Sequence, residues 1–284
     1  FGVAPGTSDS SNPNALATIS HHTIFTNVAV TDEQEPWWEG LDTRTPSLDW
    51  QGRPFDAANG PAAHPNSRFT VSARQCPSYS AKAEDPQGVP ISAIVFGGRR
   101  ASLVPLVFEA RDWTHGVLVG AAMGSETTAA ATGAVGVMRR DPMAMKPFCG
   151  YNFADYFAHW LSFDGANAKL PNIFHVNWFR KGGDGTFLWP GFGENLRVLE
   201  WMIRRVEGKA GAVETPIGHL PRAEDLNLDG VALSDEAHEL LFGFDRAGWQ
   251  AEFASIGDYL EEFGARTPQA LKDEQQRIAT RLAH

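Results

Sequence analysis

The chain has 284 residues, which is enough for one large domain or two, and its 43% hydrophobic residues, nine Trp and eighteen Phe favour a packed globule over a disordered chain. The formal net charge of −10 disfavours nucleic acid or an anionic membrane as the main partner, so an anionic ligand would need locally placed arginines. Two cysteines, Cys76 and Cys149, provide neither a disulfide framework nor a zinc cluster. No apolar run approaches membrane-spanning length, and we expect a soluble cytoplasmic protein.

The first third of the chain predicts short strands joined by long loops. Residues 1–90 contain short apolar runs, such as the run at 23–30, among Pro, Gly, Asn and Asp, and little helix is expected there. Further along, the predicted elements are strands over 91–96, 116–119, 173–179 and 187–189, a helical turn over 104–110, a turn over 182–185 and a buried helix over 151–161.

The end of the chain, from about 194 to 284, is predicted to be helical. Its first helix, over 194–206, is expected to place Leu196, Leu199, Ile203 and Val206 on one apolar face. Later helices are predicted over 234–242, 246–263 and 268–282.

The stretch from 177 to 195 concentrates aromatic residues around its glycine-rich turn. The aromatic residues are Trp178, Phe179, Phe187, Trp189 and Phe192. They could form the ordinary core of a β-hairpin. Flat rings beside flexible backbone also suit a planar heterocycle, with the rings stacked on its faces and the amide of Asn195 reading its edge. A purine nucleotide is the natural candidate for such a site.

The order F-L-W-P-G-F-G-E-N at 187–195 is typical of one enzyme family. Other blocks of that family occur in the same order at 1–7, 64–69, 96–100, 120–123, 141–145 and 150–153. The chain therefore resembles the GTP-dependent phosphoenolpyruvate carboxykinases over nearly its whole length, and the match fades after about Pro221. The resemblance implies a mixed α/β (α+β) fold: mixed sheets with long loops in the first two thirds, and a helical C-terminal region. It makes residues 1–284 the carboxy-terminal nucleotide- and substrate-binding portion of such an enzyme.

The resemblance implies conversion of oxaloacetate and GTP to phosphoenolpyruvate, CO2 and GDP. It makes Arg68 and Arg99 catalytic. The substrate-binding residues that it implies are Asn66, Ser67, Arg68 and Phe148. The GTP-binding residues that it implies are Arg68, Arg99, Trp178, Phe179, Phe187, Phe192, Gly193, Glu194 and Asn195, with Phe179 and Phe192 sandwiching the base.

The arginines also have a structural interpretation. The guanidinium fork of Arg68, Arg99 or Arg100 could grip carboxylate or phosphate through two parallel hydrogen bonds. The commoner fate of an arginine is a surface salt bridge.

Residues 124–136 are nearly free of bulky side chains and could be a flexible linker. The family resemblance instead implies a mobile lid that closes over bound substrate. The lid residues are Ser125, Glu126, Thr127, Thr128, Ala129, Ala130 and Ala131. Many relatives follow the alanines with an acidic and a basic residue, where Thr132, Gly133 and Ala134 stand here.

No G-x-x-x-x-G-K-[ST] phosphate loop occurs in the chain, since the one Gly-Lys pair, Gly208-Lys209, precedes Ala210 near a predicted helix end. The family's phosphate loop and its ligands for Mn²⁺ and Mg²⁺ are therefore expected in a preceding region. With that region the chain would be a monomeric enzyme whose partners are small molecules. Alone, it would be an inactive fragment that binds guanine nucleotide without turnover.

A third alternative is an EF-hand-like calcium protein. The segment from Asp225 to Glu236 satisfies the pattern D-x-[DN]-x-[DN]-G-x₅-E. Pro216, Gly218 and Pro221 precede it, however, where an EF-hand requires a helix. A capped loop leading into the helix at 234–242 is the simpler interpretation.

Overall fold

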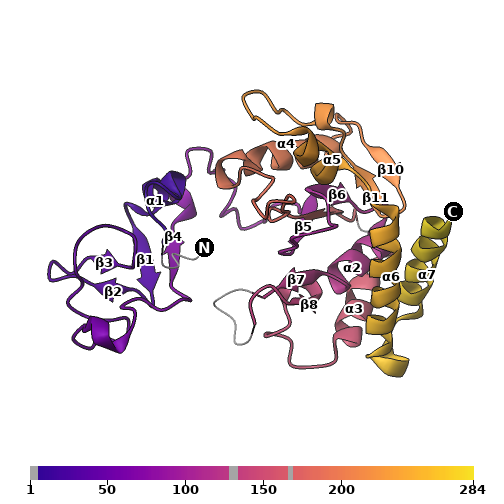
Figure 1. Ribbon diagram of the computed structural model, residues 1–284. Helices are drawn as coiled ribbons and strands as arrows, with labels where there is room; N and C mark the ends of the chain where they lie inside the picture. Colours follow the sequence, from indigo (N-terminus) through magenta and orange to yellow (C-terminus); the bar gives the residue numbers. More distant parts are fainter. Residues whose placement is uncertain (1–5, 128–133, 166–168) are drawn as a thin grey trace. The chain divides into compact units, whose positions relative to one another are not determined.

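The computed structural model describes residues 6–127, 134–165 and 169–284. It confirms the predicted fold class, because short strands and mixed sheets precede a helical C-terminal region (Figure 1). The described residues fall into two compact units, one ending at Val89 and one beginning at Pro90. In the described part of the chain, no helix is both long and apolar enough to cross a bilayer.

The described part of the smaller unit consists of short strands, long loops, one short α-helix and two 3-10 turns, so it contains little helix, as its sequence predicts. Its elements are α1 (Pro13–Ile19), β1 (Thr23–Thr26), β2 (Ala29–Val30), β3 (Pro36–Trp37) and β4 (Arg68–Val71). The predicted strand over 23–30 is divided at Asn27, whose φ of 60° interrupts the extended backbone. Antiparallel pairing of β1 with β4 sets Thr26 opposite Arg68, so Arg68 is held at the beginning of a strand.

The larger unit is built on a five-stranded mixed sheet in the order β10-β11-β6-β9-β5. The sheet strands are β5 (Ala93–Gly97), β6 (Val107–Glu109), β9 (Asn172–Val176), β10 (Val213–Thr215) and β11 (Gly218–Leu220). Strands β7 (Gly124–Glu126) and β8 (Met138–Arg140) form a separate antiparallel pair. The helices are α2 (Trp113–Ala121), α3 (Phe153–Leu161), α4 (Asn195–Val206), α5 (Asp235–Phe242), α6 (Arg246–Glu261) and α7 (Gln269–Ala283).

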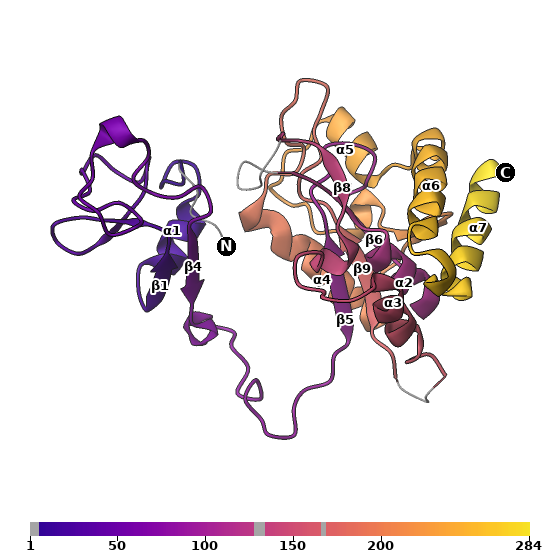
Figure 2. The same cartoon turned by 90° about the horizontal axis from the view of Figure 1, so that it is seen from below.

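Helices cover both faces of this sheet (Figure 2). Successive side chains of a strand point to opposite faces. In β9, Ile173 joins a core with α2, α3, α6 and α7, whereas Phe174 joins a second core with α4 and α5. Strand β5 pairs parallel with β9, and β6 pairs antiparallel on the other side of β9. The carboxyl ends of β5 and β9 therefore lie at the same edge of the sheet.

Two predictions between Pro90 and Val119 were wrong. The predicted helical turn over 104–110 contains strand β6, and the predicted strand over 116–119 lies inside α2. Most of α2 is buried, so its sequence is apolar all round and lacks the periodicity of a surface helix. Gly116 permits this close packing, because a Cβ there would lie 2.4 Å from the Cδ1 atom of Ile173.

The C-terminal helices begin and end close to their predicted limits, but the predicted apolar face of α4 is not the face that is buried. Val198, Trp201 and Met202 are its buried residues. Leu196 and Ile203, which belong to the predicted apolar face, are 72% and 59% exposed. The large side chains of Trp201 and Met202 bury more apolar surface than the leucines do, and they determine which face of α4 packs on the core.

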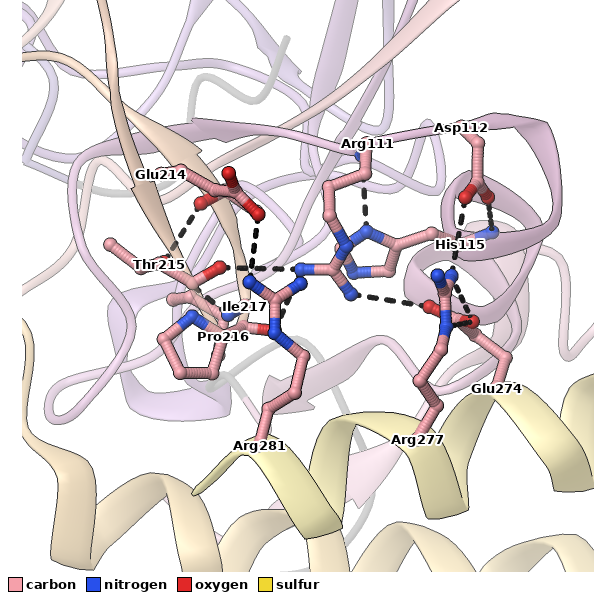
Figure 3. Close-up of polar contacts among 11 residues, drawn as sticks. Arg111, Asp112, His115, Glu214, Thr215, Pro216, Ile217, Glu274, Arg277 and Arg281 are labelled. Atoms are coloured by element: carbon pink, nitrogen blue, oxygen red, sulfur yellow. Dashed lines mark hydrogen bonds and ion pairs between the residues drawn. The ribbon is translucent and has the colours of Figure 1, made fainter. Parts of the chain in front are cut away.

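Helix α7 is held against the rest of the larger unit by charged side chains (Figure 3). The guanidinium of Arg111 donates to the Glu274 carboxylate at 3.2 Å and to the Pro216 carbonyl at 2.8 Å. Arg277 reaches Asp112 at 3.2 Å and also pairs with Glu274. The side chains of Arg111 and Glu274 are 9% and 4% exposed, so each needs the other as a partner for its buried charge.

Candidate functional site

A pocket of about 240 Å³ lies at the sheet edge where β5 and β9 end. Open sheets commonly bind ligands outside the carboxyl ends of their parallel strands. The pocket is lined by Gly97, Gly98, Arg99, Ser125, Val176, Trp178 and Phe179. Gly98 allows the loop after β5 to pack against β7, since a Cβ there would lie 2.2 Å from the Gly124 carbonyl oxygen. The pocket thus joins three segments that are distant in sequence.

Arg99 and Phe179, two of the predicted nucleotide-binding residues, are in direct contact. The Cζ atom of Arg99 lies 4.4 Å from the centroid of the Phe179 ring, a cation–π arrangement. Burial lowers the pKa of Arg99, partly offset by the charge of Glu126, yet an arginine stays protonated at neutral pH. Within the described ranges, the Arg99 guanidinium has no hydrogen bond or ion pair, so its donors remain available to an anion.

Arg100, the neighbouring candidate, has a structural role. Its guanidinium donates to both carboxylate oxygens of Glu252, at 3.1 and 3.0 Å, and Arg140 donates to Glu252 at 2.7 Å. Burial would raise the pKa of Glu252, but the hydrogen bonds and charges of the two arginines outweigh burial and keep that pKa below its usual range. All three side chains are about 10% exposed, so Arg100 is not free to grip a ligand.

Asn177 fixes the Arg99 loop relative to the aromatic segment. Its Oδ1 accepts from the backbone N–H groups of Arg100 at 3.3 Å and of Phe179 at 3.2 Å. Its Nδ2 donates to the carbonyls of Arg100 at 2.9 Å and of Val104 at 3.0 Å. The Asn177 side chain is fully buried, and all of these hydrogen bonds are to backbone groups. Sequence reasoning missed this residue, because an asparagine after a strand looks like ordinary turn chemistry.

Two of the predicted lid residues support the same loop. Ser125 and Glu126 lie in strand β7, where the Ser125 Oγ accepts from the Arg99 N–H at 3.1 Å. A carboxylate oxygen of Glu126 accepts from the Ala101 N–H at 2.7 Å. Thr127 continues the pairing with Val137 at 2.9 Å. Thr128, Ala129, Ala130 and Ala131 lie outside the described residues.

The remaining aromatic residues of the segment 177–195 differ in how deeply they are buried. Phe187 is 57% exposed and meets Phe179 edge to face, with 6.1 Å between the ring centroids. Trp178 is half-buried against the core that contains α4, and Trp189 is fully buried in it. The Trp189 indole N–H donates to the Oδ1 of Asn195 at 2.9 Å. The predicted return strand over 187–189 is reduced to a single bridge between Lys181 and Phe187.

The turn that precedes α4 contains the last predicted nucleotide-binding residues. Phe192, Gly193 and Glu194 form a short 3-10 helix, η4 (Phe192–Glu194), and the side chain of Phe192 lies outside the described part. The Glu194 carboxylate pairs with Arg197. The predicted sandwich of Phe179 and Phe192 around a base therefore remains a prediction.

Arg197 also binds the loop that satisfies the calcium-binding pattern. Arg197 donates to the carbonyl oxygens of Asn227 at 2.6 Å and of Asp229 at 3.0 Å. Glu236, the last residue of the pattern, instead accepts from the Gly183 N–H at 2.9 Å. Over the described ranges, no group of three or more His, Cys, Asp or Glu side chains could hold a metal ion. The described residues therefore provide no set of ligands for the Mn²⁺ and Mg²⁺ that the resemblance implies.

The other predicted substrate-binding residues lie apart from the pocket residues in sequence. In the smaller unit, Arg68 is exposed and its Nε donates to the Oδ1 of Asn66 at 2.8 Å, while the intervening residue in the sequence, Ser67, is fully buried. In the larger unit, Phe148 is 79% exposed. It follows a tight turn in which Met143 and Ala144 both adopt positive φ.

Comparison with known proteins gives a consistent result. Residues 1–281 match the family model described as phosphoenolpyruvate carboxykinase C-terminal P-loop domain. A phosphoenolpyruvate carboxykinase (GTP) of Chlamydia pneumoniae is 54% identical over 286 residues, covering 99% of this chain and 48% of that protein. The same-named protein of Thermoplasma volcanium is 53% identical over 274 residues, covering 96% and 46%. The chain thus spans about half the length of the curated relatives it matches. Because the family model matches nearly every residue, the chain belongs to the GTP-dependent phosphoenolpyruvate carboxykinase family.

Proposed function

We propose that this chain provides the guanine-nucleotide pocket and two arginines of an enzyme that converts oxaloacetate and GTP to phosphoenolpyruvate, CO2 and GDP. The observation that carries the proposal is the contact of the Arg99 guanidinium with the Phe179 ring at the carboxyl ends of β5 and β9. A flat ring beside a cation with free donors suits a ligand that is planar at one end and anionic at the other.

The proposed reaction places negative charge where arginines can stabilise it. Loss of the carboxylate next to the methylene carbon of oxaloacetate releases CO2 and leaves an enolate. The enolate oxygen then attacks the γ-phosphorus of GTP, and GDP departs. Arg99 would bind the nucleotide phosphates, and Arg68 with Asn66 would bind the carboxylate and enolate. Each guanidinium would bind an oxyanion through two parallel hydrogen bonds, which would orient it and offset the negative charge that develops in the transition state.

The mobile-lid interpretation is also a proposal. The hydrogen bonds of Ser125 and Glu126 to the Arg99 loop support it, because they would couple a movement of this segment to the position of Arg99. A closed lid would keep water from protonating the enolate to pyruvate before phosphoryl transfer. Shortening Ala129-Ala130-Ala131 should then abolish phosphoenolpyruvate formation while sparing decarboxylation to pyruvate. Equal loss of both activities would contradict this proposal.

Replacement of Phe179 by Ala in the full chain tests the nucleotide pocket. Loss of the stacking ring should weaken GDP binding, measured by titration calorimetry, by about 1–3 kcal/mol. Phe163→Ala is the matched control, since Phe163 is a half-exposed ring of the same unit that contacts His159 and does not line the pocket. Unchanged GDP affinity in Phe179→Ala, or equal losses in both variants, would contradict the proposal.

A second candidate is guanine-nucleotide binding without turnover. It is suggested by the coverage of only about half of each curated relative. A carboxykinase assay on this chain and on a version extended at its N-terminus separates the two candidates. Turnover in neither sample, with GDP bound in both, would favour the second.

A further inference from the structure

Trp189 is a core residue whose one side-chain hydrogen bond goes to another side chain. Its side chain is 1% exposed and belongs to the core of α4 and α5. Its indole N–H points to Asn195, the first residue of α4, and donates to the amide oxygen at 2.9 Å. Asn195 itself is half-buried.

This hydrogen bond determines whether the oxygen or the amino group of the Asn195 amide faces Trp189. An indole N–H can only donate, and of the two amide ends only the oxygen can accept. Rotating the amide by half a turn would oppose two donors and leave the buried indole N–H unsatisfied, which is unfavourable. The amino group of Asn195 is therefore left facing away from Trp189. In the described part of the chain it donates to no other group.

We propose that Trp189 is a positioning residue that makes Asn195 a hydrogen-bond donor toward position 6 of a bound purine. Guanine and hypoxanthine carry an acceptor oxygen at that position, whereas adenine carries an amino donor. A fixed donor would attract the first two bases and oppose the third. This inference rests on the proposed guanine-nucleotide site, and it assigns the discrimination against adenine to a residue that touches no ligand.

The test is Trp189→Phe in the full chain, with nucleotide affinities measured by titration calorimetry. Phenylalanine keeps a ring in the core but removes the N–H, so the amide can turn either way. We expect GDP and IDP to bind roughly tenfold more weakly, the value of one neutral hydrogen bond. Purine riboside diphosphate has no substituent at position 6 and should change less than about twofold. The preference for GDP over ADP should fall by at least the factor lost for GDP.

Trp201→Phe is a matched control. Trp201 is also 1% exposed in the same core, and its indole N–H donates at 3.2 Å to the backbone carbonyl of Gly211, away from Asn195. It should lower thermal stability without changing the ratio of GDP to ADP affinity. If Trp189→Phe does not fold, a variant with 3-benzothienylalanine at position 189 keeps the bicyclic shape and removes only the N–H, and the same shifts are expected.

The variant Asn195→Asp is a further test of the same proposal. One carboxylate oxygen would keep the bond from Trp189, and the other would present an acceptor to position 6. This variant should prefer ADP to GDP relative to the parent.

Three results would overturn the assignment to Trp189: equal weakening of all four nucleotides in Trp189→Phe, the same change of ratio in Trp201→Phe, or no change of preference in Asn195→Asp. If the parent chain binds GDP no better than ADP, the guanine site itself is refuted. A parent that prefers GDP, with an unaltered preference in Trp189→Phe, refutes only the role of Trp189.

Discussion

Asn177 connects the Arg99 loop to the aromatic segment, and replacing it by Asp should loosen both. The substitution keeps the size of the side chain and its two accepted hydrogen bonds, but it removes the Nδ2 donor to the Arg100 and Val104 carbonyls. Each buried carbonyl that loses its partner costs about 1–3 kcal/mol, so the unfolding free energy should fall by about 2–6 kcal/mol. For a unit of this size, the melting temperature should fall by roughly 5–20 °C.

Urea and thermal unfolding followed by far-ultraviolet circular dichroism measure this change, because helices α2 to α7 lie in the larger unit. Asn227→Asp is the control, since Asn227 is exposed and its side chain is observed only as an acceptor. It should change stability by less than about 0.5 kcal/mol. We also expect weaker GDP binding in Asn177→Asp, because the Arg100 carbonyl next to Arg99 loses its bond to the side chain that also accepts from the Phe179 N–H. Stability within experimental error of the parent, together with parental GDP affinity, would refute this reasoning.

Three further perturbations test other parts of the larger unit. Glu252→Gln leaves two buried arginines without a counter-charge and should cost about 3–5 kcal/mol in urea unfolding, whereas Glu261→Gln, at an exposed pair, should cost less than about 0.5. Equal costs would show that burial of the cluster is not decisive. Burial, with a smaller effect of a nearby arginine, lowers the pKa of His175 to about 4, so the unfolded chain takes up this proton first as the pH falls. Stability should therefore be present at pH 7 and should fall by about 2 kcal/mol by pH 5 through this residue alone. His175→Phe should remove that part of the slope, and an unchanged slope would contradict the assignment. Arg99→Lys should weaken GDP binding about tenfold without unfolding, because a lysine lacks the planar fork that stacks on Phe179. Parental GDP affinity in this variant would make Arg99 a surface charge.

Elements that alternate between core and solvent were predictable from sequence. Helices α5, α6 and α7 have caps or breakers at their ends and a repeated apolar stripe, and the structure has them close to the predicted limits. Strand β6 and helix α2 were interchanged, because β6 is fully buried and α2 is mostly buried, and periodicity then gives little information. Their assignment depends on the sheet and helices that surround them.

The candidate site was partly predictable for a similar reason. Aromatic residues and arginines near glycines are visible in one dimension, and the structure places Arg99 against Phe179. The pairing of Arg100 with Glu252, however, joins residues that are 152 positions apart. No local pattern distinguishes Arg99 from Arg100, since only the tertiary fold determines which one finds a carboxylate.

The same long separations constrain how the larger unit can fold during synthesis. Arg111 and Glu274 are 163 residues apart, and Arg277 meets Asp112 across 165. At bacterial and eukaryotic elongation rates, a ribosome needs roughly 8–30 s to make that length of chain. During this interval Arg111 has no carboxylate partner from α7, and the apolar side of α2 that α7 later covers stays open. The larger unit would then be a client for chaperones until its last helix emerges, whereas β1 and β4 of the smaller unit can already pair.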